Sequence, residues 1–245
     1  MAASRRDFLR SAATPAVAVG AVGGGTQVAG AGTAYAADGT GAASAGASTG
    51  SSASASASSS GPVSANGWPV DTSPNTGGSV WTRPVPGTGF GVEVAIGDVE
   101  TILVHVVRRF HYEVDALRAG DVIGYRPLAR TEDYETNHAS GTAVDIRPDS
   151  YPAGARGGFY APELAVVRDI LADCEGVVKW GGDFATPDES HFQIDVPPGS
   201  TELTRVAAKL RTWNATPGEG AGVAQDPRDA ERRAAARELQ RRQAG

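Results

Sequence analysis

The stretch ETNHASGTAVDIRPDS, residues 135–150, passes from a polar turn into an alternating strand within a few positions. From residue 142 on, β-branched side chains alternate with Ala143 and Asp145, and a period of two is typical of a β-strand. The segment SHFQIDV, residues 190–196, alternates in the same way and has His191 among its polar positions. The sequence therefore predicts two short strands, each with an apolar face and a polar face.

The polar faces of these two segments define a candidate site. If the two strands share a sheet, Asp145 and His191 can meet on one face. His138 lies upstream of Gly141, in a turn that can fold it back toward Asp145. Two histidines and a carboxylate are the kind of ligand set that holds a catalytic zinc ion and leaves one position open. The residues alone also allow a simpler interpretation, a loop histidine and a surface carboxylate that are close by chance.

Two acids precede the second histidine and are candidates for a catalytic base. A water molecule in the open position of such a zinc site has a pKa of about 7, and Asp188 or Glu189 could accept its proton. A strand that already ran through Pro187 would place Glu189 on the same face as His191, but a proline there argues against that strand. On residue types alone, both acids stay candidates.

Two further segments have the spacing of helices. In GDVETILVHVVRRFHYEV, residues 97–114, apolar side chains repeat every three or four positions, and Asp98 stands where a helix cap is expected. A second helix is predicted to begin near Ala161, with Pro162 in its first turn and an apolar side that includes Cys174. Helices mixed with irregularly spaced short strands indicate an α+β domain.

The N-terminal part of the chain differs in composition from the rest. Residues 1–36 look like a twin-arginine signal peptide, because Arg5 and Arg6 precede a weakly apolar stretch and AYA at residues 34–36 fits a signal peptidase site. Residues 37–66 are almost entirely Ala, Ser, Gly and Thr, which predicts a flexible linker. We therefore expect export to an extracellular or cell-wall location, with no stable membrane span after cleavage.

The remaining residues divide into a domain and a tail. Residues 67–214 are long enough for one domain with its own core. Residues 215–245 are highly charged and contain a segment that could start a helix at Asp226. Since Val223 and Leu239 are its only large apolar residues, we expect a disordered tail or a solvated, fraying helix. Contact of its arginines with an anionic wall polymer is the alternative.

Charge and cysteine content exclude several classes of function and site. The 245-residue chain carries a formal net charge of −6 and has basic ends, so its central region is acidic and a nucleic-acid partner is not expected. A single cysteine, Cys174, excludes an intrachain disulfide and a cysteine-based zinc site. The chain is expected to act as a monomer.

Three motifs, in this order along the chain, resemble a known family. The upstream element GYRP, residues 124–127, is similar to a G-Y-R motif. From His138 the sequence follows the pattern H-x-x-G-x-A-x-D-[IL], and WGGDF at residues 180–184 precedes D-x-x-H-F at residues 188–192. Together, between about residues 99 and 196, these motifs resemble the VanY-like zinc D-Ala-D-Ala carboxypeptidases and the related L-alanyl-D-glutamate endopeptidases.

The resemblance implies a role for each matching residue. It implies that His138, Asp145 and His191 are zinc ligands. It makes Asp188, three residues before the last ligand, the catalytic base, and Arg126 the residue that binds the substrate's carboxylate or polarises the scissile carbonyl. It also implies a small, mostly antiparallel sheet with packed helices, as in hedgehog and DD-peptidase folds.

Several neighbours of these residues depart from the family pattern or have open roles. Thr136 stands where the family usually has serine, which keeps a hydroxyl near the first ligand, and the segment after Arg126 lacks a common glutamine. Asp183 is a candidate for orienting a metal ligand. His105 and His111 are expected to be structural or surface residues.

With the expected export, the resemblance implies a secreted zinc metallopeptidase that hydrolyses a peptide bond next to a D-amino acid in the peptidoglycan stem peptide. Carboxypeptidase and endopeptidase activity both stay open, as does the exact peptide. The alternative is a non-catalytic, zinc-containing module of the same fold that binds the cell wall or a protein. The presence of Asp188, Glu189 and Arg126 favours the enzyme.

Overall fold

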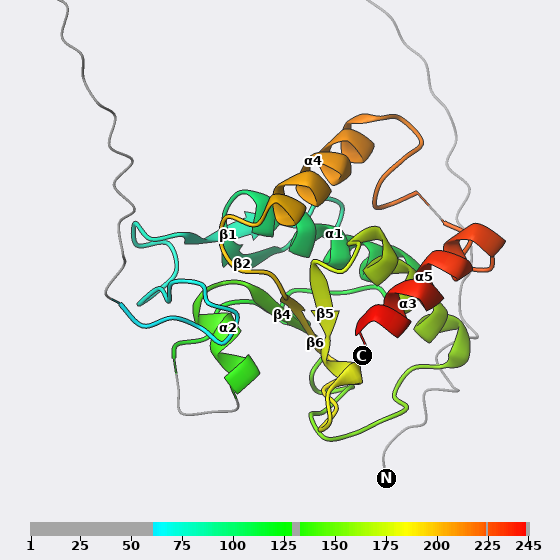
Figure 1. Ribbon diagram of the computed structural model, residues 1–245. Coiled ribbons are helices and arrows are strands. Elements are labelled where there is room, and N and C mark those ends of the chain that lie inside the picture. Colours follow the sequence, from blue (N-terminus) through cyan, green and yellow to red (C-terminus); the bar gives the residue numbers. More distant parts are fainter. Residues whose placement is uncertain (1–60, 129–132, 224, 244–245) are drawn as a thin grey trace, which may run out of the picture. The chain divides into compact units, whose positions relative to one another are not determined.

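The main sheet of the computed structural model has four antiparallel strands (Figure 1). Their order is β3 (Val122–Ile123), β4 (Ala143–Ile146), β6 (His191–Ile194) and β5 (Val178–Trp180). A separate antiparallel hairpin pairs β1 (Val80–Pro84) with β2 (Gly91–Ala95). The structure describes residues 61–128, 133–223 and 225–243, all within one compact unit.

Helices surround this sheet and confirm the predicted α+β fold. They are α1 (Asp98–Glu113), α2 (Thr136–Ala139), α3 (Ala161–Asp173), α4 (Thr201–Ala215) and α5 (Ala230–Gln243). Short 3-10 turns at Asp133–Glu135 and Gly181–Asp183 precede α2 and follow β5. Figure 1 shows α4 packed along α1, and α5 beside α3. No helix within the described ranges is long and apolar enough to cross a membrane.

The two predicted strands are neighbours in the sheet, as expected. β4 pairs with β6 so that Asp145 lies directly opposite His191. Every residue of both strands is buried, so the polar face is enclosed rather than solvated. The apolar face packs on the stripe of α1, whose buried side chains are Val99, Ile102, Leu103, Val106, Val107 and Phe110.

The predicted helices are present, but one cap was assigned to the wrong residue. Asp98 is the first residue of α1, and Gly97 occupies the cap position, with its N–H donating to the Glu100 carboxylate at 3.4 Å. The Asp98 carboxylate instead accepts hydrogen bonds from Thr204 and Arg211 of α4. It therefore ties two helices together rather than capping one.

The second helix begins where the sequence predicted. α3 starts at Ala161 with Pro162 in its first turn, and Cys174 follows its last residue. Cys174 is fully buried, and burial raises the pKa of its thiol, so it is a core residue.

The folded region begins earlier than the predicted boundary at residue 67. The Asn66 side chain donates to Thr142 Oγ1 and to the carbonyl of Ile194, both at 2.8 Å, and Ser64 is buried. These bonds satisfy polar groups beside β4 and β6, so residues 61–66 belong to the domain and not to the linker. The predicted signal peptide, and the predicted linker up to residue 60, lie outside the described residues.

The C-terminal segment, expected to be a disordered tail or a solvated, fraying helix, contains a helix that packs on the domain. The helix is capped by Asp229, not Asp226: the Asp229 carboxylate accepts the N–H groups of Glu231 and Arg232 at 3.0 Å. Leu239 is only 3% exposed, and α5 packs against α3. The end of the helix is fixed as well, because Gln243 Nε2 donates to the carbonyl of Val178 at 3.0 Å.

The contacts of α5 with α1 and α3 are largely ionic. A pattern of apolar residues in the sequence does not reveal contacts of this kind. Arg109 of α1 is 1% exposed and binds Glu113, Asp169 and Asp173 at 2.5–2.8 Å. Arg232 of α5 closes the same cluster with bonds to Asp169 at 2.7 and 2.8 Å and to Asp173 at 3.1 Å. Burial alone would raise the pKa of Asp173, but its partners outweigh burial and lower that pKa to about 2.

Replacement of Arg232 by alanine is expected to lower the free energy of unfolding by about 1–3 kcal/mol, because two buried carboxylates lose a partner. The loss is modest because the Arg232 side chain is 25% exposed and solvent screens its charge. Urea unfolding measures the effect. Arg233→Ala is the matched control, since Arg233 is exposed and the change should stay within about 0.5 kcal/mol. Equal stability of the two variants would contradict the ionic docking of α5.

Candidate metal centre and active site

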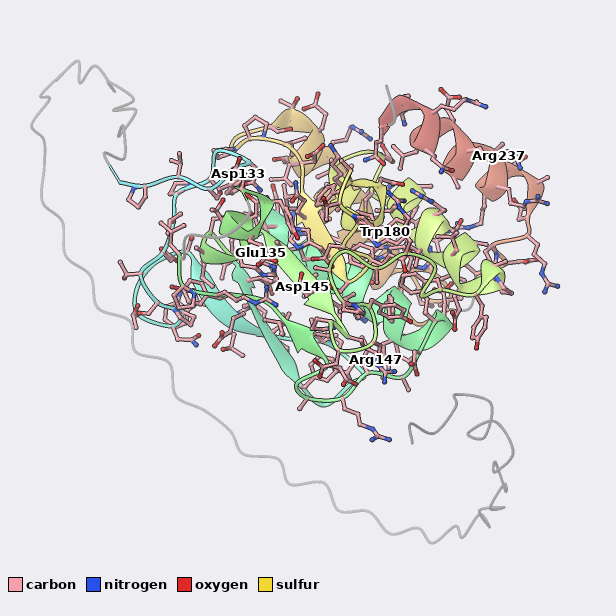
Figure 2. The ribbon with its side chains drawn as sticks, turned by 90° about the horizontal axis from the view of Figure 1, so that it is seen from below. Asp133, Glu135, Asp145, Arg147, Trp180 and Arg237 are labelled. Carbon is pink, nitrogen blue, oxygen red and sulfur yellow. The ribbon has the colours of Figure 1, made fainter. Side chains whose placement is uncertain are left out.

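The structure brings the three predicted ligand residues together. His138 lies on α2, Asp145 on β4 and His191 at the start of β6. All three are buried, and one ligand atom from each lies within 4.8 Å of the others. Figure 2 shows Asp145 in the middle of the domain, close to Glu135. The group could hold a metal ion.

A tight turn folds His138 back onto the strand, as the sequence predicted. Gly141 has a φ of 66°, and its N–H donates to the carbonyl of His138 at 3.0 Å. A Cβ at this position would lie 2.6 Å from the backbone nitrogen of Ala95. Only glycine combines this backbone conformation with such a close approach to β2.

The partners of the two imidazoles decide which nitrogen of each faces the centre. His138 Nδ1 lies 2.5 Å from the carbonyl oxygen of Gly124, which can only accept, so Nδ1 carries the proton. His191 Nε2 lies 3.1 Å from Gln193 Oε1, which also accepts from Asn137 Nδ2 at 2.9 Å. His191 Nε2 therefore donates as well, and in the neutral rings His138 Nε2 and His191 Nδ1 keep their lone pairs.

These lone pairs point at the same carboxylate oxygen. His138 Nε2 lies 3.1 Å and His191 Nδ1 lies 2.8 Å from Asp145 Oδ1. Three acceptor atoms without a proton between them repel one another, and a cation relieves that repulsion. The donor set and its fixed tautomers therefore fit a divalent metal of the nitrogen- and oxygen-binding kind.

Asp145 is held in its charged form. Burial alone would raise the pKa of Asp145. When protons take the place of a metal ion on these two nitrogens, hydrogen bonds from His138 and His191 and the charges of the protonated rings outweigh burial and hold the pKa of Asp145 well below its usual range. Its second oxygen, Oδ2, accepts from Arg126 Nη2 at 2.5 Å. A charged carboxylate is the form that binds a metal ion.

Arg126 stands at the edge of this centre, where the GYRP motif ends. Its Nη1 donates to Glu135 Oε2 at 2.8 Å while Nη2 contacts Asp145, so the guanidinium bridges two carboxylates. The side chain of Arg126 is 34% exposed, so part of it stays open to a ligand. The motif has a second contribution, since the carbonyl of Gly124 orients His138.

Asp188 is buried beside the metal-binding group. Its Oδ1 accepts from the N–H and the hydroxyl of Ser190, at 3.2 and 2.7 Å, and its Oδ2 accepts from Tyr134 OH at 3.3 Å. The Tyr134 ring lies edge-on to His191, with ring centres 4.9 Å apart. Burial, and then the charges of Asp188 and Glu135, raise the pKa of Tyr134, so the phenol stays protonated and donates to Asp188.

Glu189, the other candidate base, has a different task. Its two carboxylate oxygens accept the N–H groups of Gly157 and Gly158 at 2.8 and 2.7 Å. β6 begins at His191, so the strand does not extend back through Pro187 and the alternation that favoured Glu189 does not apply. Glu189 anchors the loop before α3.

A cleft of about 570 Å³ opens beside Tyr134 and Gln193. Tyr134 contacts His191 and Asp188, and Gln193 contacts His191, so the cleft adjoins the candidate metal centre. Its other walls come from the N-terminal segment and the loop after β5. The remaining lining residues are Ala65, Asn66, Asp133, Phe184, Ala185, Thr186 and Asp195.

The comparison with protein families identifies one segment of the chain. Residues 129–194 match a family model described as D-alanyl-D-alanine carboxypeptidase. The matched segment contains His138, Asp145, Asp188 and His191, whereas Arg126 lies just before it. The match supports a peptidase that acts on peptidoglycan. Comparisons with curated proteins and with solved structures gave no match.

Within and around the carboxypeptidase-like segment, neither Thr136 nor the candidate Asp183 supports a ligand residue. The Thr136 hydroxyl does not reach a ligand: it donates to the carbonyl of Asp133 at 2.6 Å and accepts from the N–H of Ala65 at 2.8 Å. Asp183 does not orient a ligand either, because both of its oxygens bind Arg168. Its position on the 3-10 turn after β5 directs it toward α3.

The other two histidines are structural, as the sequence predicted. His105 Nε2 lies 3.3 Å from Asp173 in the buried ionic cluster, and burial lowers the pKa of His105. His111 Nδ1 accepts from the N–H of Leu117 at 2.8 Å, which closes the turn after α1.

Sequence reasoning did not single out the residues that support the ligands and the base. Tyr134 and Glu135 contact Asp188 and Arg126, and the amides of Asn137 and Gln193 orient His191. The alternation of side chains along β6 is a sequence signal that points to one of these residues, Gln193. Gln193 is two positions after His191, so it shares that face of β6.

Gln193→Leu is expected to weaken metal binding by roughly 10–100-fold, the usual effect of removing a hydrogen-bond partner of a ligand histidine. The loss follows because His191 Nε2–H then has no acceptor and the ring is free to turn. Competition with a chromogenic chelator measures the zinc affinity. Gln193→Glu keeps an acceptor and should retain affinity; an unchanged affinity in the leucine variant would contradict the role of this amide.

Proposed function

We propose that this protein is a zinc metallopeptidase that hydrolyses a peptide bond next to a D-amino acid in the peptidoglycan stem peptide. The observation that carries the proposal is the buried His138–Asp145–His191 group, inside the segment that matches the carboxypeptidase model. The twin-arginine pattern at residues 1–36 supports export, which brings the protein to the compartment where this substrate is found.

Zinc held by two imidazoles and a carboxylate would supply a Lewis acid that polarises the scissile carbonyl and lowers the pKa of the attacking water. His138, Asp145 and His191 would hold it through the atoms that already face one another. Their outer partners, Gly124 and Gln193, fix both rings in the tautomer that binds metal.

Asp188 would accept the proton of the attacking water and pass it to the leaving amine. Its carboxylate is held by Ser190 from one side and by Tyr134 from the other, so its direction is fixed before substrate arrives. Such positioning is what makes a general base effective. The carboxylate of Glu189 is directed instead to the backbone of Gly157 and Gly158 in the loop before α3, whereas Asp188 faces Tyr134, whose ring lies against the ligand residue His191.

Arg126 would bind the substrate through the exposed part of its guanidinium. The planar guanidinium can donate two parallel N–H bonds to a substrate carboxylate, such as that of the terminal D-residue of a stem peptide, and it can also donate to a carbonyl oxygen. The guanidinium of Arg126 is bound to Glu135 and Asp145, so this side chain would link the substrate to Asp145, a proposed metal ligand.

Arg126→Lys is expected to lower kcat/KM on the order of 10²-fold, because the ammonium keeps the charge but loses the two-pronged contact. The melting temperature should change little, since the side chain is partly exposed. Steady-state kinetics on a stem pentapeptide, with a thermal melt of the same sample, measures both. Normal kinetics, or a variant that unfolds, would count against the assignment.

Incubation of the zinc-loaded protein with defined muropeptides, followed by mass spectrometry, tests the proposal and separates its two forms. Loss of the terminal D-Ala identifies a carboxypeptidase, and internal cleavage identifies an endopeptidase. Intact substrate with zinc bound would instead indicate the non-catalytic module that binds the wall or a protein.

A further inference from the structure

The exposed side of α5 is basic, although the chain as a whole is acidic. The helix AERRAAARELQRRQ carries five arginines and two glutamates, in a protein with a formal net charge of −6. Arg232 is used in the buried cluster, and Arg241 pairs with Glu238. Arg233 and Arg237 are exposed, and neither makes a side-chain ion pair or hydrogen bond within the part of the chain that the structure describes.

These two arginines line a hollow and do not simply project into solvent. A hollow of about 230 Å³ lies between α3 and α5, and its walls include the exposed Arg233 and Arg237, together with Arg168, whose charge is paired with Asp183. The one carboxylate in its lining, Asp169, is already bound by Arg109 and Arg232. Among the residues that the structure describes, Arg233 and Arg237 therefore give the hollow positive charge that no carboxylate in its lining compensates.

A second hollow shares lining residues both with this one and with the cleft beside the candidate metal centre. It has a volume of about 430 Å³, and its lining includes Lys179, Gln240 and Asp183, whose carboxylate is bound by Arg168. It shares Phe184 and Ala185 with the cleft and shares Gln240 with the hollow between α3 and α5. We call the two hollows together the α5 groove. Figure 2 shows Arg237 on α5 at the edge of the domain and Asp145 in its middle.

We propose that the α5 groove binds the carboxylate-bearing peptide–glycan polymer whose stem peptide is cut in the adjoining cleft. The proposal rests on the proposed function, since it assigns the rest of the same substrate to a surface next to the cleft. A polymer that carries one carboxylate after another matches the cations of Lys179, Arg233 and Arg237, none of which has a side-chain ion pair among the described residues. The polymer passes from the cleft to the groove over the Phe184–Ala185 segment, which lines both.

Co-sedimentation with insoluble peptidoglycan, stripped of phosphate polymers, tests the groove without any turnover. The protein carries His138→Ala, so binding does not depend on hydrolysis. Adding Arg233→Gln and Arg237→Gln is expected to weaken binding on the order of tenfold, the combined effect of two exposed charge contacts. The matched control is Arg228→Gln with Arg242→Gln, which removes the same charge from residues outside the groove and should change binding less than about twofold.

A kinetic measurement separates this proposal from the proposed function. In the active protein, the groove variant (Arg233→Gln with Arg237→Gln) should have a higher KM for the polymer. Its kcat/KM for a short free pentapeptide should be unchanged. Equal losses of binding in the groove and control variants would overturn the proposal, as would tighter binding to phosphatidylglycerol vesicles than to peptidoglycan. Absence of hydrolysis in the active protein, with groove-dependent sedimentation retained, would overturn only the proposed function.

Discussion

Asp188→Asn is expected to lower kcat by roughly 10²–10⁴-fold while zinc stays bound, because the amide cannot accept the proton of the attacking water. The replacement is nearly isosteric and leaves His138, Asp145 and His191 untouched. Its oxygen can still accept from Ser190, so the turn before β6 should hold. Kinetics on a stem pentapeptide, with the zinc content of the same preparation, measures both quantities.

Glu189→Gln is the matched control for this prediction. It loses one of two bonds to the loop at Gly157 and Gly158, so a small loss of stability and a much smaller loss of rate are expected. If Glu189→Gln were inactive and Asp188→Asn active, with zinc bound in both, the base would be Glu189.

His191→Ala is expected to lose bound zinc and activity together, down to the level of the chelated protein. Two remaining protein ligands are too few for a tight site, and metal binding depends on the full set of deprotonated donors. The variant also leaves Gln193 without its imidazole partner. Elemental analysis after dialysis measures the zinc content, and hydrolysis of a stem pentapeptide measures the activity.

His111→Gln is the control for a histidine outside the site. His111 accepts a hydrogen bond from the backbone of Leu117, so its replacement should affect stability alone. Stoichiometric zinc in His191→Ala, or loss of zinc in His111→Gln, would contradict the assignment of the ligands.

The sequence was sufficient for the centre of the fold because two periodic strands carry the site. A period of two around Asp145 and His191 predicted both strands, and the structure places these residues opposite each other. The glycine at residue 141 predicted the turn that returns His138. These features are local, so they can be read from a few consecutive residues.

Contacts made across the chain were not predictable in the same way. The cap at Gly97 depends on backbone conformation, and the docking of α5 depends on Arg109 and Arg232 sharing Asp169 and Asp173. Buried ion pairs leave no apolar pattern in the sequence of a helix. The link between Tyr134 and Asp188 spans 54 residues and follows from the fold alone.

Zinc titration of the metal-free protein, with hydrolysis of a stem pentapeptide followed at each addition, tests the central claim most directly. The account predicts no turnover after chelation, a linear rise on adding zinc, and saturation at one zinc ion per chain. Turnover that survives chelation, or saturation with zinc that leaves the pentapeptide and defined muropeptides intact, would contradict it.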